Sequence, residues 1–383
     1  MRTRAKILDR NDPLAGRRDE FVLPDPELIY LDGNSLGRTP KRTTDALRTV
    51  VEEHWGGDLI MSWWDHGWLD MPLIVGDELA PILGAHPGEI AVHDSTTVCL
   101  FQLVNVALDL TGGAVIAIAA TEFPTDRYVI EGIARLRPGV TVRHGLDELA
   151  GVDVVVRSLV DYRTAELHDL AAETARARTA GAITVWDLSH AAGVVEVDLA
   201  GADVDLATGC TYKFLNGGPG APAFTFVRSE LHSQVVQPIW GWFGQQNQFE
   251  MDNPFRARAD IGRMLNGTPG ILGLTAARCG IAASAEAGIA SIAAKARALG
   301  NYAIDVADYL GLTCSTARPP KSSGGHISII HPDATTLQQQ LARRKIIVDK
   351  RDPNVLRFGL APLTTRFVDV HDGLTALAGM MVE

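Results

Sequence analysis

The chain has 383 residues, of which 46% are hydrophobic and 21% charged, a composition typical of a globular protein with a large core. Its formal net charge of −11 argues against a nucleic-acid partner, because such a partner requires a basic face. No signal peptide is apparent, and the most apolar run, 112–120, is about half of what a bilayer span needs. We therefore expect no membrane contact.

Four cysteines are spread along the sequence, at positions 99, 210, 279 and 314. They are too far apart to form a zinc knuckle or a redox pair, so we predict no metal site. Their sparseness favours a reducing compartment, and we expect a cytoplasmic protein.

Short apolar strands alternate with helices through the middle of the chain. In chain order we expect strands over 29–32, 89–93, 114–119, 152–156, 183–186, 204–207 and 223–227, with helices over 96–110 and 165–178. Strands that are apolar on both faces and alternate with helices are typical of a mostly parallel sheet covered by helices on both faces. The sequence therefore predicts an α/β fold.

The pattern changes near residue 275. The Ala-rich stretch 275–299 predicts one long helix, and the strands expected at 326–330 and 355–358 indicate a smaller α+β unit. We expect a large domain over 46–274 and a small domain built from 1–45 and 275–383.

The segment Gly33-Asn-Ser-Leu-Gly37 matches Gly-x-Ser-x-Gly, the nucleophile elbow of serine hydrolases, which would make Ser35 a nucleophile. Such an elbow normally follows several strands of the main sheet, whereas a single short strand precedes this one. A tight turn that uses two glycines is the competing interpretation.

Lys213 and Asp187 form the most informative pair. The chain has seven lysines against 28 arginines, and Lys213 is the only lysine between Lys41 and Lys295. A lysine kept in an apolar segment of such a chain indicates that a primary amine is needed, as in Schiff-base chemistry. Asp187 ends a predicted buried strand, where a carboxylate can hold the proton of a pyridinium nitrogen. A surface lysine with a helix-capping aspartate is the alternative.

Other candidate residues have two interpretations each. Thr96 and Thr97 begin a predicted helix, where hydroxyls and free N–H groups suit a phosphate or simply cap the helix. Trp242 lies between glycines, in a loop suited to stacking on a flat substrate or in an aromatic core. Arg357 either binds a carboxylate or lies on the surface.

Four motifs in order resemble the kynureninase family, pyridoxal-phosphate enzymes of the aspartate aminotransferase fold (fold type I, class V). They are 123–126 (FPTD), 186–193 (WDLSHAAG), 211–216 (TYKFLN) and 241–244 (GWFG), and the resemblance begins at 30–37 (YLDGNSLG). The resemblance covers nearly the whole chain, up to 357–362 (RFGLAP).

The resemblance implies pyridoxal 5'-phosphate as the cofactor. Lys213 would form the Schiff base and carry protons, Asp187 would pair with the ring nitrogen, Phe123 would stack on the ring, and Tyr212 would relay a proton. The residues implied to contact the cofactor are Thr96, Thr97, Phe123, Asp126, Ser158, Asp187, His190, Tyr212, Lys213, Trp242 and Asn266.

The resemblance also implies a homodimer in which the partner subunit supplies Trp242 and Asn266. Arg357 would bind the α-carboxylate of the substrate, while Ser35, Phe243, Asn266 and His66 would surround an aryl ketone. The segment 62–70 that contains His66 aligns loosely, and Cys99 stands where the family carries Asn.

The implied reaction is hydrolysis of the Cβ–Cγ bond of L-kynurenine, or of its 3-hydroxy form, in tryptophan catabolism and NAD biosynthesis. The products are anthranilate, or 3-hydroxyanthranilate, and L-alanine. The main alternative is another class V enzyme such as a cysteine desulfurase, for which Cys314 is the candidate cysteine. More remote alternatives are a serine hydrolase that uses Ser35 and a non-enzymatic binding protein.

Overall fold

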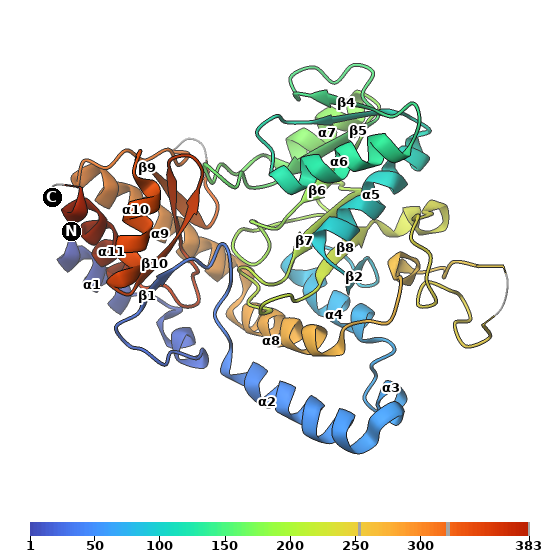
Figure 1. Cartoon of the computed structure of the whole chain (residues 1–383), viewed down its shortest axis with the longest axis horizontal. Coiled ribbons are helices and arrows are strands. Elements are labelled where there is room, and N and C mark those ends of the chain that lie inside the picture. The colour runs from blue at the N-terminus through green and yellow to red at the C-terminus, as the bar shows by residue number, and fades with distance from the viewer. Residues whose placement is uncertain (252–253, 319–321, 382–383) are drawn as a thin grey trace.

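The computed structural model describes residues 1–251, 254–318 and 322–381. It contains a seven-stranded sheet and a separate four-stranded sheet, which form the large and small bodies of Figure 1. Among the described residues, no helix combines the length and apolar character that a bilayer crossing requires.

The large sheet has the strand order β2-β8-β7-β6-β5-β3-β4. Its strands are β2 (Ile90–His93), β3 (Val115–Ile118), β4 (Thr141–His144), β5 (Val154–Ser158), β6 (Ile183–Asp187), β7 (Leu206–Cys210) and β8 (Ala223–Val227). Strand β8 runs antiparallel to both of its neighbours, and the other adjacent pairs are parallel. The carboxyl ends of β2, β3, β5, β6 and β7 therefore share one edge.

Both faces of this sheet are covered by helices. They are α4 (Met71–Leu79), α5 (Thr96–Thr111), α6 (Pro124–Leu136), α7 (Leu170–Thr179) and α8 (Ile271–Ala287). Neighbouring residues of β6 face opposite sides of the sheet. Val185 packs in the core with α5 and α6, and Trp186 packs in the core with α4 and α8. Burial on both faces explains the continuous apolar strands, and the predicted α/β fold is confirmed.

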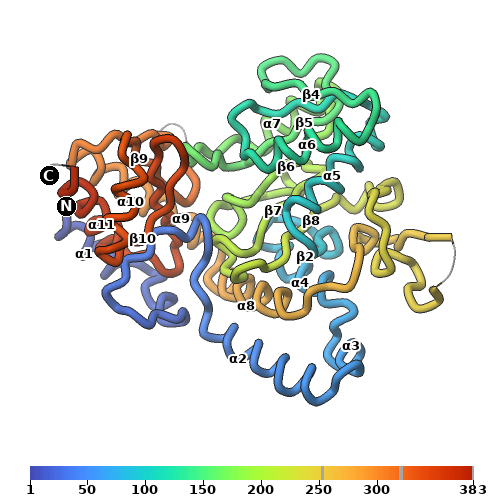
Figure 2. Tube along the Cα trace, in the orientation of Figure 1, coloured from blue at the N-terminus to red at the C-terminus, as the bar shows by residue number. Residues whose placement is uncertain are grey.

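The small body combines both ends of the chain. Its sheet has the order β1-β10-β11-β9, with β1 (Ile29–Leu31), β9 (His326–Ile330), β10 (Ile346–Arg351) and β11 (Val355–Gly359). Its helices are α1 (Arg2–Arg10), α9 (Ile289–Tyr309), α10 (Ala334–Arg343) and α11 (Phe367–Met380). Arg2 forms an ion pair with Asp372 of α11, so the two termini lie side by side (Figure 2).

Some elements differ from those predicted. The helix expected over 275–299 is two helices, α8 and α9, because Gly288 takes a positive φ of 78° between them. The helix expected from residue 165 begins only after Asp169, whose side chain caps α7 by accepting from Ala172 N. Strands β4 and β10 were not predicted.

A projecting arm connects the small body to the large one. It consists of α2 (Lys41–Thr49), a π-helical stretch over Val50–Asp58, and the short helix α3 (Ser62–Asp65). Figure 1 shows this arm extending below the large sheet.

Candidate active site

The carboxyl edge of the large sheet gathers the predicted residues of β5, β6 and β7. Ser158 and Asp187 are the last residues of β5 and β6, and they are register partners. Asp187 is also the register partner of Thr208 in β7, and Lys213 follows that strand by three residues. Open α/β sheets bind ligands at this edge.

The amine of Lys213 lies in a buried environment. The residue is 9% exposed, and its Nζ lies 3.4 Å from both ring nitrogens of His190. The same nitrogen is 5.9 Å from the ring centroids of Phe123 and Tyr212. Within the described chain, no carboxylate oxygen lies within the 4.0 Å that would define an ion pair with this amine. The amine therefore has no ion-pair partner within that distance, although its charge reaches Asp126 and opposes the rise that burial causes in the pKa of that carboxyl.

Three buried carboxyl groups cluster near this amine. Asp126 at the start of α6, Asp187 and Glu122 are at most 7% exposed. Burial, followed by the charges of Asp187 and Glu122, raises the pKa of Asp126 well above its usual range. Asp126 Oδ2 is buried without a hydrogen-bond partner, so the cluster has capacity for a donor that the chain does not supply.

Glu122 is a site residue that the sequence reasoning missed. Its carboxylate accepts hydrogen bonds from Phe123 N and Ser158 N, both at 3.1 Å, and burial raises its pKa. It therefore ties the start of α6, with the Phe123 ring, to the end of β5. No motif indicated this role, although the residue directly precedes Phe123.

The first turn of α5 lies at the same sheet edge, directly after β2. Ser95 caps the helix by accepting from Val98 N, and Gly112 ends it in the left-handed region. Thr96 and Thr97 occupy the first two helical positions and are partly or fully exposed. Their hydroxyls and the free N–H groups of a 16-residue helix suit an anionic group.

Arg357 on β11 brings the small sheet to this site. It is fully buried, donates from Nη1 to Tyr162 O at 2.7 Å, and places the same atom 3.4 Å from His190 Nε2. His190 therefore lies between the lysine and the arginine. Burial, and then the charges of Lys213 and Arg357, lower the pKa of His190 well below its usual range, so this imidazole is neutral.

Ser35 lies in the arginine part of the site. Its Oγ donates to Asp349 Oδ2 at 3.1 Å and lies 3.5 Å from Arg357 Nη2. The nucleophile-elbow interpretation does not hold, because β1 belongs to the small sheet and, in the described structure, Ser35 has no histidine partner. The two glycines instead form a turn, and Gly37 N donates to Tyr212 O at 2.8 Å.

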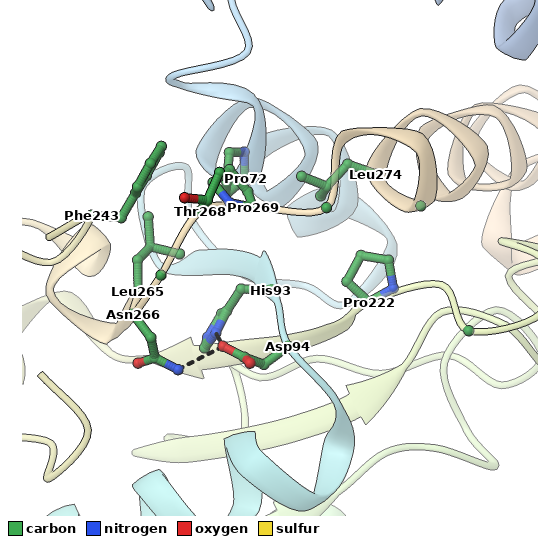
Figure 3. A pocket seen from close by; sticks show the side chains of 14 residues that line it. Pro72, His93, Asp94, Pro222, Phe243, Leu265, Asn266, Thr268, Pro269 and Leu274 are labelled. Atoms are coloured by element: carbon green, nitrogen blue, oxygen red, sulfur yellow. Dashed lines mark hydrogen bonds and ion pairs between the residues drawn. The ribbon is translucent and has the colours of Figure 1, made fainter. Parts of the chain in front are cut away.

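A second group of predicted residues lines a pocket of about 320 Å³ (Figure 3). Asn266 Nδ2 donates to Asp94 Oδ2 at 2.6 Å, and Figure 3 shows Phe243 on the same side of the pocket as Asn266, with Leu265 between them. Trp242 packs edge-on against Phe243 and donates to Thr268 Oγ1 at 3.3 Å. Asn266 therefore contacts Asp94, which precedes the α5 cap, within the same chain. None of the pocket-lining residues belongs to the Lys213 group, by which we mean Lys213, His190, Arg357, Ser35 and the three buried carboxyl residues.

The described contacts of His66 are with residues of the arm. Its ring stacks on His54 at 3.5 Å between centroids and bonds Asp58 Oδ2 at 2.7 Å. Its substrate-binding role stays a prediction. Cys314, the candidate for a desulfurase, forms an isolated bridge with Ile329 of β9 and is partly buried.

The Lys213 group fits pyridoxal phosphate on the chemistry of its donors. Three buried carboxyl groups face one buried amine, so a protonated ring nitrogen would supply a missing positive charge and a donor for Asp126 or Asp187. The first turn of α5 offers an anion site at the same edge. The unpaired amine of Lys213 is available to an aldehyde.

Solved structures with similar folds agree with this assignment. The apo structure of a cysteine desulfurase from Thermococcus onnurineus NA1 matches with a TM-score of 0.79 and 19% identity, covering 96% of each chain. A lysine-to-alanine mutant of C-DES with glycine covalently linked to its PLP cofactor matches with a TM-score of 0.81 and 16% identity, covering 93% of this chain and 99% of that one. The fold of this chain is therefore that of these structures, fold type I, and its site carries the amine, the acids and the anion site that a pyridoxal-phosphate enzyme requires.

The sequence comparisons are more specific. The kynureninase of Pseudomonas fluorescens is 39% identical over 98% of this chain and 94% of its own length, and that of Burkholderia pseudomallei (strain 1106a) is 38% identical over 100% and 96%. The kynureninase C-terminal domain model matches residues 292–377. The chain belongs to the kynureninase family, whose members are pyridoxal-phosphate-dependent hydrolases. Cysteine desulfurases are neighbours in fold alone.

Proposed function

We propose that this protein hydrolyses the Cβ–Cγ bond of L-kynurenine, or of its 3-hydroxy form, to release the anthranilate and L-alanine. The observation that carries the proposal is the unpaired amine of Lys213, held between neutral His190 and the carboxyl cluster in a chain of this family. Membership of tryptophan catabolism follows from that substrate, and the four unpaired cysteines support a cytoplasmic location.

Lys213 is the proton carrier of the proposed reaction. When bound, pyridoxal phosphate supplies an electron-withdrawing ring that acidifies the α-proton of an attached amino acid. Lys213 Nζ takes this proton and returns it. His190, which is neutral, accepts a hydrogen bond from the amine and adds no positive charge beside it. Burial of the amine limits proton exchange with bulk water.

The carboxyl cluster controls the opposite end of the cofactor site. Asp187 provides the negative charge that keeps a ring nitrogen protonated, and Asp126, whose pKa is raised, holds a proton beside it. Phe123 presents its ring near Lys213 and lies edge-on against Tyr162, with centroids 5.2 Å apart. This contact fixes the ring for stacking on the cofactor.

Tyr212 is proposed to relay protons between the phosphate end and the reacting carbon atoms. Burial raises the pKa of its phenol, so the hydroxyl carries its proton at neutral pH. Ser158, held by Glu122, and the hydroxyls of Thr96 and Thr97 would bind the cofactor at its phosphate end.

The substrate would bind between the two sheets. Arg357 binds the α-carboxylate, and its position beside His190 places the α-carbon within reach of Lys213. Ser35 lies on the same side of the site, while Phe243, Asn266 and His66 are proposed to surround the aryl ketone.

We further propose that the functional unit is a homodimer, with Trp242 and Asn266 supplied to the site by the partner subunit. The arm and the loop that contains Trp242 carry large apolar side chains that are more than half exposed: Leu59, Ile60, Met61, Trp64, Trp240, Phe249 and Met251. Apolar side chains exposed together on one region of a protein support a protein interface there. In Figure 1 the arm and this loop both project from the large body.

In the test, purified protein that carries pyridoxal 5'-phosphate is incubated with L-kynurenine in one reaction and with 3-hydroxy-L-kynurenine in another. We expect fluorescent anthranilate or 3-hydroxyanthranilate together with L-alanine in equal amounts. Borohydride reduction of the loaded protein should place the reduced adduct on the peptide that contains Lys213. Absence of both products would overturn the reaction, and an adduct elsewhere would overturn the site.

A further inference from the structure

An acid–base cluster beside the predicted carboxylate site contains two residues that no motif indicated. Asp349 on β10 is the register partner of Arg357 on β11. Asp349 Oδ2 accepts from Arg357 Nε at 3.0 Å and also from Nη2. The arginine side chain is fully buried and the aspartate side chain is 13% exposed, so this ion pair is well shielded from water.

Arg351 shares the same aspartate. Its Nη1 donates to Asp349 Oδ1 and its Nη2 lies beside Asp349 Oδ2, both at 3.0 Å. Its Nε is buried without a hydrogen-bond partner, although the side chain as a whole is 32% exposed. One carboxylate is therefore held between two guanidinium groups, of which the second retains an unused donor and access to solvent.

The distribution of charge determines what this cluster can bind. The positive charge of Arg357 is already balanced by Asp349, and its Nη1 is bonded to Tyr162 O. An incoming carboxylate that met this pair alone would find no net positive charge. Arg351 adds a second positive charge, which offsets the nearby carboxyl of Asp32 when that group is ionised, and it is close enough to contribute to the lowered pKa of His190.

Resting on the proposed function, in which an amino-acid carboxylate binds at Arg357, we propose that Arg351 is a second carboxylate-binding residue and that Asp349 positions both guanidinium groups. The paired Arg357 then orients the carboxylate, while Arg351 provides the charge that attracts it. The ligand class is an α-amino acid, and the selectivity is against amines that lack the carboxylate.

The first experiment compares L-alanine with ethylamine as ligands of the loaded protein, with binding read from the absorption of the cofactor. Arg351→Gln should raise the Kd of L-alanine about tenfold, as expected for loss of one charge-assisted contact, and change that of ethylamine less than about twofold. Arg344→Gln is the matched control, because Arg344 is an exposed arginine beyond α10, outside the described site. It should alter neither Kd, and cofactor content should be equal in all three proteins.

A second variant keeps the test decisive. Arg351→Gln combined with Asp349→Asn restores the net charge of the cluster, and the preference for L-alanine should recover at least in part. The proposal is overturned if Arg351→Gln weakens both ligands equally, if it weakens neither, or if the double variant binds L-alanine more weakly than the single one. These results do not depend on kynurenine turnover, so failure of the proposed reaction would be seen separately.

Discussion

The group of predicted residues around Lys213 and the group around Trp242 and Asn266 differ in how many of their contacts a single chain provides. Around Lys213, the side chains are buried, and His190 contacts both Lys213 of the large body and Arg357 of the small sheet. Around Trp242 and Asn266, the pocket is lined by Phe243 and Asn266, and the loop that carries Phe243 also exposes Trp240. A single chain thus orders the amine and the acids by itself, whereas the second group lies beside the exposed surface that the proposed dimer would cover.

The strongest way to break the first group is to remove its amine. Lys213→Ala should fold but lose steady-state turnover of L-kynurenine by at least about a thousandfold, because it removes the amine that lies beside His190 and is proposed to carry the proton. The measurement is kcat together with borohydride labelling. Lys6→Ala, at an exposed position of α1, is the control and should keep both. Wild-type turnover in Lys213→Ala would exclude the proposed role.

The next largest effect is expected where the small sheet meets this group. Arg357→Ala should raise KM for L-kynurenine roughly 30- to 100-fold, because it removes a charge-assisted pair worth about 2–3 kcal/mol. Steady-state kinetics should assign most of the change to KM and little to kcat. If KM stays unchanged, Arg357 does not bind the carboxylate.

The second group is tested by mixing two inactive variants. We expect Lys213→Ala and Asn266→Ala to be poorly active alone, and their co-expression to recover about a quarter of wild-type activity, since half of the dimers would have one intact site. Activity and mass of the isolated mixed species are the measurements. Mixing Lys213→Ala with Asp187→Ala is the control and should recover nothing, because both changes affect the same chain's residues. No recovery with Asn266→Ala would place Asn266 in its own chain's site.

The smallest effect concerns Asp32, close to the arginine part of the first group. Burial raises the pKa of its carboxyl to about 6, so the folded state favours the protonated form. The stabilisation from this proton is complete below about pH 4 and is lost as the pH rises through 6. Asp32→Asn should therefore gain about 1–2 kcal/mol of unfolding free energy relative to wild type between pH 4 and pH 7, after allowance for partial exposure.

Urea unfolding of Asp32→Asn and wild type at several pH values measures this difference. Asp147→Asn, at an exposed position between β4 and β5, is the control for the loss of a carboxyl group elsewhere in the chain. A difference between Asp32→Asn and wild type that does not change with pH would show that the carboxyl of Asp32 titrates normally in the folded protein.

The sequence allowed accurate prediction where the signal was local. Continuous apolar strands located the buried sheet, and the scarcity of lysine drew attention to Lys213. Glu122, Asp349 and His326 could not be found in this way, because their importance comes from contacts between segments far apart in the chain. His326, for example, is buried on β9 with its ring 6.0 Å from that of His190, a contact that depends on the placement of the small sheet.

Gly288 is the residue at which the chain passes from α8, on the large sheet, to α9, in the small body. Helix α8 packs against the turn after Lys213, where a Cβ on Gly280 would lie 2.0 Å from Leu215 O, while α9 packs in the core of the small sheet. The change of direction between these helices occurs at a single residue with a φ of 78°. The distance between the reactive nitrogen and the anion receptor is therefore set jointly by this bend and by direct contacts between the two bodies, such as the hydrogen bond from Arg357 Nη1 to Tyr162 O.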